Sequence, residues 1–211
     1  RDIPVIPSGK RDRSWKEGVI KNKLDTPDMR DLPLPEATPE DYRNAQTTMG
    51  ERDGELLQSF NGVGNLSYVL PPDTQGDVGP NHYMQMVNSS FAIWNKSGSI
   101  VYGPVDIKTL WNGFPGPWSG TNDGDPVVLY DEQADRWIAS QFALPNYPNG
   151  PFYEMIAVSQ TGDPTGSWYR YAFTFTNMPD YPKLGVWHDG YYLSVNSFTS
   201  GSLNYNGTGV A

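Results

Sequence analysis

An internal repeat of 54 residues limits the possible architecture more than any other feature of the sequence. It is marked by three apolar stretches, residues 83–88, 137–142 and 191–196, and each stretch opens with an aromatic side chain. Repeats of this length are typical of propeller blades and of solenoid coils. In both architectures one copy cannot bury its apolar face alone, so we expect neighbouring copies to share a core.

The second copy of the repeat predicts four short strands in succession, at residues 127–130, 137–142, 155–160 and 168–173. Turn-forming stretches rich in Asp, Gly and Pro separate them. In the first copy, residues 83–94 predict a strand, and Asn95-Lys-Ser-Gly98 predicts a hairpin turn into a returning strand at 99–103. Four antiparallel strands in about 50 residues match one propeller blade.

We therefore predict an all-β fold. Residues 56–211 form the opening of a partial β-propeller of two to three four-stranded blades, and residues 1–55 form an extended, mostly irregular arm. Two to three blades cannot close a ring, so an edge strand stays exposed unless more polypeptide completes it. The sequence begins at Arg1 without a Met and stops in the approach to another strand, so we expect a processed or excerpted piece of a longer chain.

The arm differs in composition from the remainder of the chain. Residues 1–55 hold 10 of the 15 Lys and Arg and 12 of the 24 Asp and Glu, with six prolines and few aromatic residues. This mixture favours an extended segment over a core. It is either a plain linker or an arm that docks on a neighbouring domain or subunit through scattered apolar residues, namely Ile3, Val5, Ile6, Trp15, Val19, Ile20 and Leu24.

Composition also narrows the range of partners. The formal net charge is −9, which disfavours nucleic acid or an anionic membrane as the main partner because both require a basic surface. The chain has no cysteine, so disulfides and thiolate metal sites are excluded. No apolar run approaches the roughly 18 residues of a membrane span.

Several motifs resemble a group of large secreted bacterial β-propeller proteins that are often joined to sorting or adhesion modules. The resemblance covers about residues 68–200. It is carried by Pro71-Pro-Asp-Thr-Gln-Gly-Asp-Val-Gly-Pro-Asn-His-Tyr83, Asp123-Gly-Asp-Pro-Val-Val-Leu-Tyr-Asp131, Ser159-Gln-Thr-Gly-Asp-Pro-Thr-Gly166 and Asp180-Tyr-Pro-Lys-Leu-Gly-Val-Trp187. It implies a secreted or cell-surface protein and supplies no defined activity.

A looser resemblance is to furanosidase-type five-bladed glycoside hydrolases. The shared features are Asp-Pro before an inner strand and the stretch Pro164-Thr-Gly-Ser-Trp168 at the end of a blade. This resemblance implies that Asp77, Asp125 and Asp180 point into an axial funnel. The chain departs from the pattern because it has no glutamate in the position of the acid: Glu154, the only Glu after Glu132, falls in a third strand.

Four residues are candidates for catalysis: Asp77, Asp125, Asp180 and His188. Two carboxylates about 5 to 10 Å apart can hydrolyse a glycosidic bond, and a histidine can abstract a proton in a lyase. The alternative is structural, because an Asp beside Gly or Pro often caps a turn, and its repetition in every copy suits a structural role better than catalysis.

Two further sites are predicted. Asp123, Asp125 and Asp131 supply hard oxygen ligands for Ca²⁺, although their spacing differs from the 12-residue calcium loop, and a solvated acidic turn is the alternative. Trp111 and Trp118 lie in a predicted crossing loop at 104–118 and are candidates for a sugar-binding platform, whereas the strand tryptophans are expected in the core.

Two functions fit these features. The first is a non-catalytic extracellular scaffold that binds glycans or protein neighbours, with its arm docked on an adjacent subunit or domain and its sheet edge met by the remainder of the propeller or a neighbouring subunit. The second is a polysaccharide-degrading enzyme, a glycoside hydrolase or a lyase, with an axial active site.

Overall fold

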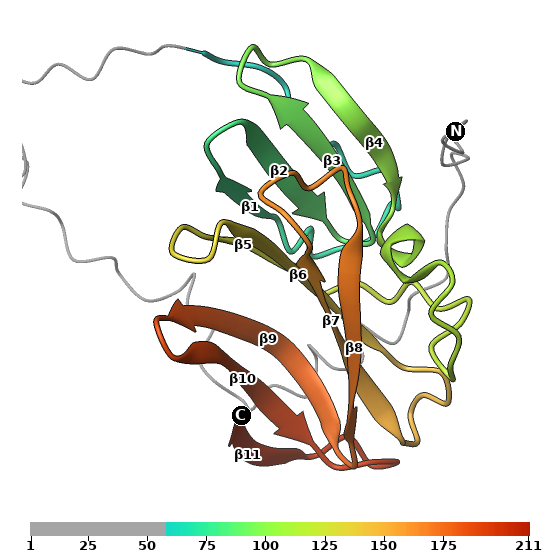
Figure 1. Ribbon diagram of the computed structural model, residues 1–211. Helices are drawn as coiled ribbons and strands as arrows, with labels where there is room; N and C mark the ends of the chain where they lie inside the picture. The colour runs from blue at the N-terminus through green and yellow to red at the C-terminus, as the bar shows by residue number, and fades with distance from the viewer. Residues whose placement is uncertain (1–57) are drawn as a thin grey trace, which may run out of the picture.

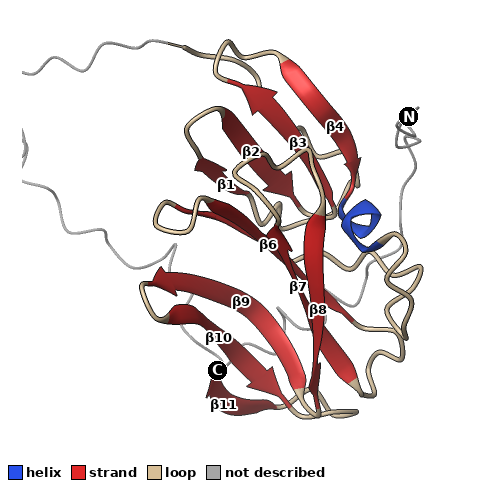
Figure 2. Ribbon diagram, in the orientation of Figure 1, coloured by secondary structure: helices blue, strands red, loops and turns tan. Residues whose placement is uncertain are grey.

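The computed structural model describes residues 58–211, and these residues form three antiparallel sheets with almost no helix (Figures 1 and 2). The first sheet consists of β1 (Gln75–Val78), β2 (His82–Val87), β3 (Ser90–Asn95) and β4 (Ile100–Asp106). The second consists of β5 (Val127–Asp131), β6 (Arg136–Ala143), β7 (Phe152–Ser159) and β8 (Trp168–Phe175). The third consists of β9 (Met178–Trp187), β10 (Gly190–Phe198) and β11 (Tyr205–Val210).

The 54-residue period is carried by the second strand of each sheet. These strands, β2, β6 and β10, begin at His82, Arg136 and Gly190, which are 54 residues apart. Within each sheet the strands follow one another in chain order, as an antiparallel meander. The first strands lie side by side, since β1 contacts β5 and β5 contacts β9 (Figure 1). The all-β class and the repetition are thus confirmed.

The 54-residue period is kept although the loops that connect the strands differ in length between the sheets. The first sheet has a tight turn between β2 and β3 and a long connection to β5 that includes the 3-10 helix η1 (Ile107–Trp111). The second sheet has long loops at 144–151 and 160–167, and its last strand runs almost directly into β9. The single strand predicted over residues 83–94 is wrong, because Asn88, with φ 56°, turns the chain and divides this stretch into two strands.

The main core forms between the first and second sheets. Its buried residues come from β2, β3, β4, η1, β5 and β6: Met84, Met86, Phe91, Ile93, Val105, Ile107, Val128, Trp137 and Ala139. Trp137 is fully buried, and its indole N–H donates to the carbonyl of Gly162 at 3.1 Å. A second cluster joins the second and third sheets and consists of Phe142, Leu144, Phe152, Met178 and Phe198.

Two further predictions concern the N-terminal arm and membrane-spanning segments. The arm at residues 1–55 lies outside the described residues. Within residues 58–211, no helix has the length and apolar character that crossing a membrane requires.

Candidate functional site

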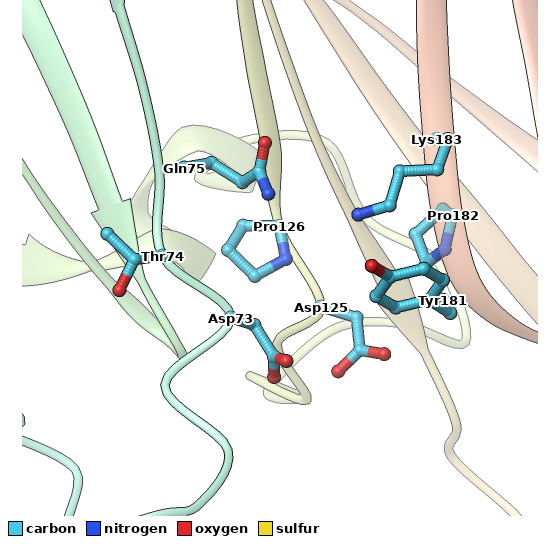
Figure 3. Close-up of a pocket in the computed structure, with 8 residues that line it drawn as sticks. All are labelled: Asp73, Thr74, Gln75, Asp125, Pro126, Tyr181, Pro182 and Lys183. Carbon is cyan, nitrogen blue, oxygen red and sulfur yellow. The ribbon is translucent and has the colours of Figure 1, made fainter. Parts of the chain in front are cut away.

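A polar pocket of about 210 Å³ lies at the first strands of the three sheets, before or at the start of β1 and β5 and within β9 (Figure 3). Each sheet contributes a short stretch to its lining. The lining residues are Asp73, Thr74 and Gln75 from the first sheet, Asp125 and Pro126 from the second, and Tyr181, Pro182 and Lys183 from the third. The repeat therefore places three equivalent segments around one hollow.

The three segments share an unusual backbone conformation. Asp73, Asp125 and Tyr181 have φ values of 43°, 49° and 53°. Each stands two residues before a residue of the first strand of its sheet, namely Gln75, Val127 or Lys183. These three residues pair with Met86, Ser140 and Ser194 of the second strands, which are 54 residues apart. Asp accepts the left-handed region more readily than most residues, whereas for Tyr it is strained. Strained residues of this kind often cluster at binding sites.

The pocket contains both signs of charge. Figure 3 shows the Asp73 and Asp125 carboxylates pointing to the same side, while the Lys183 amine extends toward Pro126. The amine lies 3.8 Å from the centre of the Tyr181 ring, within the range of a cation–π contact. Carboxylate acceptors, an ammonium donor and the Gln75 amide thus all belong to the lining of one small pocket.

One buried carboxyl interacts electrostatically with a residue that lines the pocket, Asp125. Glu154, in β7, is fully buried, and neither of its oxygens has a hydrogen-bond partner of normal geometry. Burial raises its pKa well above the usual value; the Ser140 hydroxyl lowers it and the Asp125 carboxylate raises it. Burial therefore favours the protonated form of this carboxyl, which does not line the pocket.

The four candidate catalytic residues are not brought together. Asp125 lines the pocket, and Asp180 directly precedes the lining residue Tyr181. Asp77 lies within β1, and His188 lies exposed in the turn between β9 and β10, at the opposite end of β9 from Asp180.

Two carboxylates of the first strands tie neighbouring sheets together. Asp77 accepts hydrogen bonds of 2.7 Å from the backbone N–H groups of Val78 and of Tyr130 in the second sheet. Asp131 accepts the N–H groups of its own turn and a 2.9 Å hydrogen bond from the Tyr191 hydroxyl in the third sheet. Burial and this hydrogen bond raise the pKa of Tyr191 to about 12.

The hydrogen bonds that Asp77 accepts predict that its replacement lowers the stability of the protein. We expect Asp77→Ala to lower the free energy of unfolding by roughly 1.5–3 kcal/mol, the range for hydrogen bonds to a charged group. Urea unfolding followed by tryptophan fluorescence measures it, with the more exposed Asp189→Ala as the control. Unchanged stability in Asp77→Ala would contradict the structural role.

Two of the predicted calcium ligands, Asp123 and Asp131, accept hydrogen bonds from other groups of the protein. Asp131 caps its turn, and Asp123 accepts a 2.8 Å hydrogen bond from the N–H of Leu144. Among residues 58–211, no group of three or more His, Asp or Glu side chains is arranged to hold a metal ion. Calcium binding by Asp123, Asp125 and Asp131 stays a prediction from the sequence.

The two loop tryptophans pack inward. Trp111, at the end of η1, is 6% exposed and belongs to a cluster with Tyr153 and Met155. Trp118 stacks on Phe114 at 5.1 Å between ring centroids, and its indole N–H donates to the carbonyl of Phe114. Trp118 is half-buried against the same cluster, so neither ring forms an open platform in this arrangement.

Comparison with known proteins adds no further assignment. No family model, curated protein or solved structure matches the chain. The functional argument therefore depends on the described geometry and on the sequence.

Proposed function

We propose that this protein is an extracellular or cell-surface scaffold of the propeller type that binds glycans or protein neighbours through the pocket between the first strands. The supporting observation is the side-by-side arrangement of β1, β5 and β9, with equivalent segments of three sheets around one polar hollow. Ligand sites commonly lie where several repeated elements converge and a few polar groups fix orientation. The propeller motifs of the sequence support the same function.

The size and chemistry of the pocket define its ligand. About 210 Å³ is below the range for drug-sized molecules, so the pocket suits one terminal sugar unit or one polar side chain of a protein partner. Asp73 and Asp125 accept hydrogen bonds from hydroxyl groups, and Lys183 donates to a hydroxyl or carboxylate oxygen. Such mixed-sign surroundings favour a polyhydroxylated ligand over an apolar one.

Binding to a polysaccharide and glycan panel tests this proposal. We expect Asp125→Asn to weaken binding at least about tenfold, because a hydrogen bond to a charged group contributes roughly 1.5–3 kcal/mol. Asn keeps the shape and tolerates the left-handed backbone of Asp125. Lys183→Met should weaken binding similarly, whereas Asp189→Asn, in the distant turn, should not. Equal binding by all four proteins would contradict the assigned pocket.

The second candidate is a polysaccharide-degrading enzyme, which one observation favours. Burial raises the pKa of the Glu154 carboxyl, on which the Asp125 carboxylate acts electrostatically, and a pair of carboxyl groups is typical of glycosidases. Assays of reducing ends and of unsaturated uronate absorbance on the same panel discriminate between the two functions. Turnover that Asp125→Asn abolishes would establish the enzyme, and no turnover together with retained binding supports the scaffold.

A further inference from the structure

A second pocket, of about 440 Å³, lies on the face of the first sheet that points away from the main core. Its floor includes Tyr83 and Gln85, which alternate along β2 with the core residue Met84 and therefore point to the opposite face. Val78 of β1 pairs with Tyr83 and lines the pocket beside it. The described lining residues of this pocket and of the pocket between the first strands do not overlap.

The segment that precedes the first sheet forms one wall of the second pocket. Phe60 lines the pocket and packs on Tyr83 and on Trp94 of β3, at 6.0 and 5.6 Å between ring centroids. The side-chain amide of Gln58 donates to the carbonyl of Ser97 at 3.1 Å, which holds this segment beside the turn between β3 and β4 (Figure 1). Phe60 remains 38% exposed, so part of its ring is open to a ligand.

Two glycines make room for the side chains of the floor. A Cβ at Gly62 would clash with the side-chain oxygen of Gln85. A Cβ at Gly76 would clash with the Tyr83 hydroxyl. The Gln85 oxygen also accepts a 2.7 Å hydrogen bond from the backbone N–H of Val63. Close packing and this hydrogen bond therefore fix the floor of the pocket.

The charged side chain among the described lining residues is Lys96, in the turn between β3 and β4. It is exposed, and no carboxylate of residues 58–211 forms an ion pair with its amine. Lys108, in contrast, is paired with Asp106 at 3.2 Å. A ligand with a negative group would therefore meet a cation at the rim of this pocket without competition from a described carboxylate of the lining.

The Tyr83 hydroxyl supplies a neutral hydrogen-bond donor. Burial raises the pKa of Tyr83, a side-chain hydrogen bond with Gln85 lowers it, and the Asp77 carboxylate raises it. The net direction is upward, so the hydroxyl keeps its proton at neutral pH. Asp77 itself accepts the backbone N–H of Tyr130 in the second sheet and does not line the pocket.

These groups match the chemistry of a sugar unit that carries a carboxylate. The rings of Phe60 and Tyr83 provide apolar surface for one face of a sugar ring, while the Tyr83 hydroxyl and the Gln85 amide provide polar contacts for its hydroxyl groups. Lys96 donates to a carboxylate as a charge-assisted hydrogen bond. The volume lies within the range of small-molecule sites, which combine an apolar and aromatic lining with a few polar groups.

We propose that this pocket binds a uronate unit of an acidic polysaccharide, with Phe60 and Tyr83 against the sugar ring and Lys96 paired with its carboxylate. The site is separate from the pocket between the first strands and goes beyond the function proposed above. Two pockets of different charge on one scaffold would distinguish an acidic sugar unit from a neutral one.

Calorimetric titration of the full chain tests the ligand class. The probes are tetramers of galacturonate and of glucuronate, together with their methyl esters, which keep the rings and remove the charge. We expect at least one acid to bind, and its ester to bind at least about tenfold more weakly because it loses the charge-assisted hydrogen bond. An oligoglutamate of equal charge should bind no better than the ester. Binding of neither acid, equal binding of acid and ester, or equal binding of acid and oligoglutamate would overturn the proposal.

Substitution of Lys96 tests the assigned cation. Lys96→Met should weaken binding of the acid at least about tenfold and leave binding of the ester unchanged. The matched control is Lys108→Met, because Lys108 is also a partly exposed lysine but does not line the pocket. Equal weakening by the two substitutions, or by neither, would overturn the proposal.

Substitution of Phe60 tests the contact with the ring. Phe60→Ala should weaken binding of acid and ester by the same factor, because both probes have the same ring. The control is Tyr169→Ala, since Tyr169 is 54% exposed in β8 and lies outside the pocket. Circular dichroism checks that both variants fold. Unchanged binding by a folded Phe60→Ala variant would overturn the proposal.

A comparison of the two lysines separates the two pockets. Lys183→Met should leave binding of the acid unchanged, and Lys96→Met should leave binding of neutral glycans unchanged. Loss of acid binding in Lys183→Met but not in Lys96→Met would place the acid between the first strands and overturn the proposal. Acid binding that depends on Lys96, without any neutral glycan binding, would support this site and contradict the pocket assignment made above.

Discussion

Replacing Trp137 with alanine is expected to lower the free energy of unfolding by roughly 3–5 kcal/mol, the range for removing a buried aromatic side chain. The ring is fully buried in the cluster shared by the first and second sheets and contacts Tyr130 at 5.1 Å between ring centroids. Its indole N–H also donates to the carbonyl of Gly162, which would lose this partner. The substitution therefore removes packing and one buried hydrogen bond together.

Urea unfolding measured by circular dichroism gives the size of this effect. The matched control is Trp187→Ala, because Trp187 is 63% exposed at the end of β9. Its loss should change the free energy of unfolding by no more than about 0.5 kcal/mol. A loss below about 1 kcal/mol in Trp137→Ala would contradict a core shared between the two sheets.

Replacing Glu154 with glutamine is expected to stabilise the protein increasingly as the pH rises. The pKa of Glu154 is raised in the folded protein, so the folded state keeps a proton that the unfolded state loses above its own, ordinary pKa. The stability that this group contributes is fully present below the unfolded pKa and falls as the pH rises toward the folded pKa. Glutamine has a similar shape and does not ionise, so the variant lacks this loss.

Thermal unfolding at pH 4 and pH 8 measures the difference. We expect nearly equal melting temperatures at pH 4 and an advantage of at least about 3 °C for Glu154→Gln at pH 8, given that 1 kcal/mol shifts the melting temperature by roughly 2–4 °C in a domain of this size. The control is Glu132→Gln, at an exposed position, which should show no such divergence. An advantage independent of pH would mean that Glu154 is ionised in the folded state.

The strands of the second sheet follow closely from the sequence. All four were predicted within three residues of their observed ends, because Gly, Pro and Asp mark each turn. The turn at Asn88 was missed because Asn88-Ser89-Ser90 stands between two apolar stretches without a Gly or Pro. A left-handed asparagine can turn a hairpin without either residue, and only the pairing of Val87 with Ser90 reveals it.

The candidate site was predicted in part. The sequence selects Asp125, which lines the pocket, but it does not select Asp73 or Tyr181. Their positions differ from that of Asp125 by 52 and 56 residues, so a strict period of 54 passes over them. The available signal is the pair Asp125-Pro126 and Tyr181-Pro182, in which a proline follows the residue with positive φ.

The buried Glu154 shows a different limit of prediction. A glutamate in an apolar strand gives no indication of whether it points to solvent or into a contact between sheets. Its burial depends on the packing of the third sheet against the face that carries Phe142 and Phe152. That packing joins segments distant in the sequence, which a local pattern does not specify.

The meander order within each sheet has a consequence for biosynthesis. Neighbouring strands are consecutive in the chain, so most pairings are local and the contact order within a sheet is low, which favours rapid formation. Domains of this kind can assemble as they leave the ribosome. The first sheet nevertheless lacks Val128, Trp137 and Ala139 until β6 has been translated, so these three residues do not cover its apolar face during that interval.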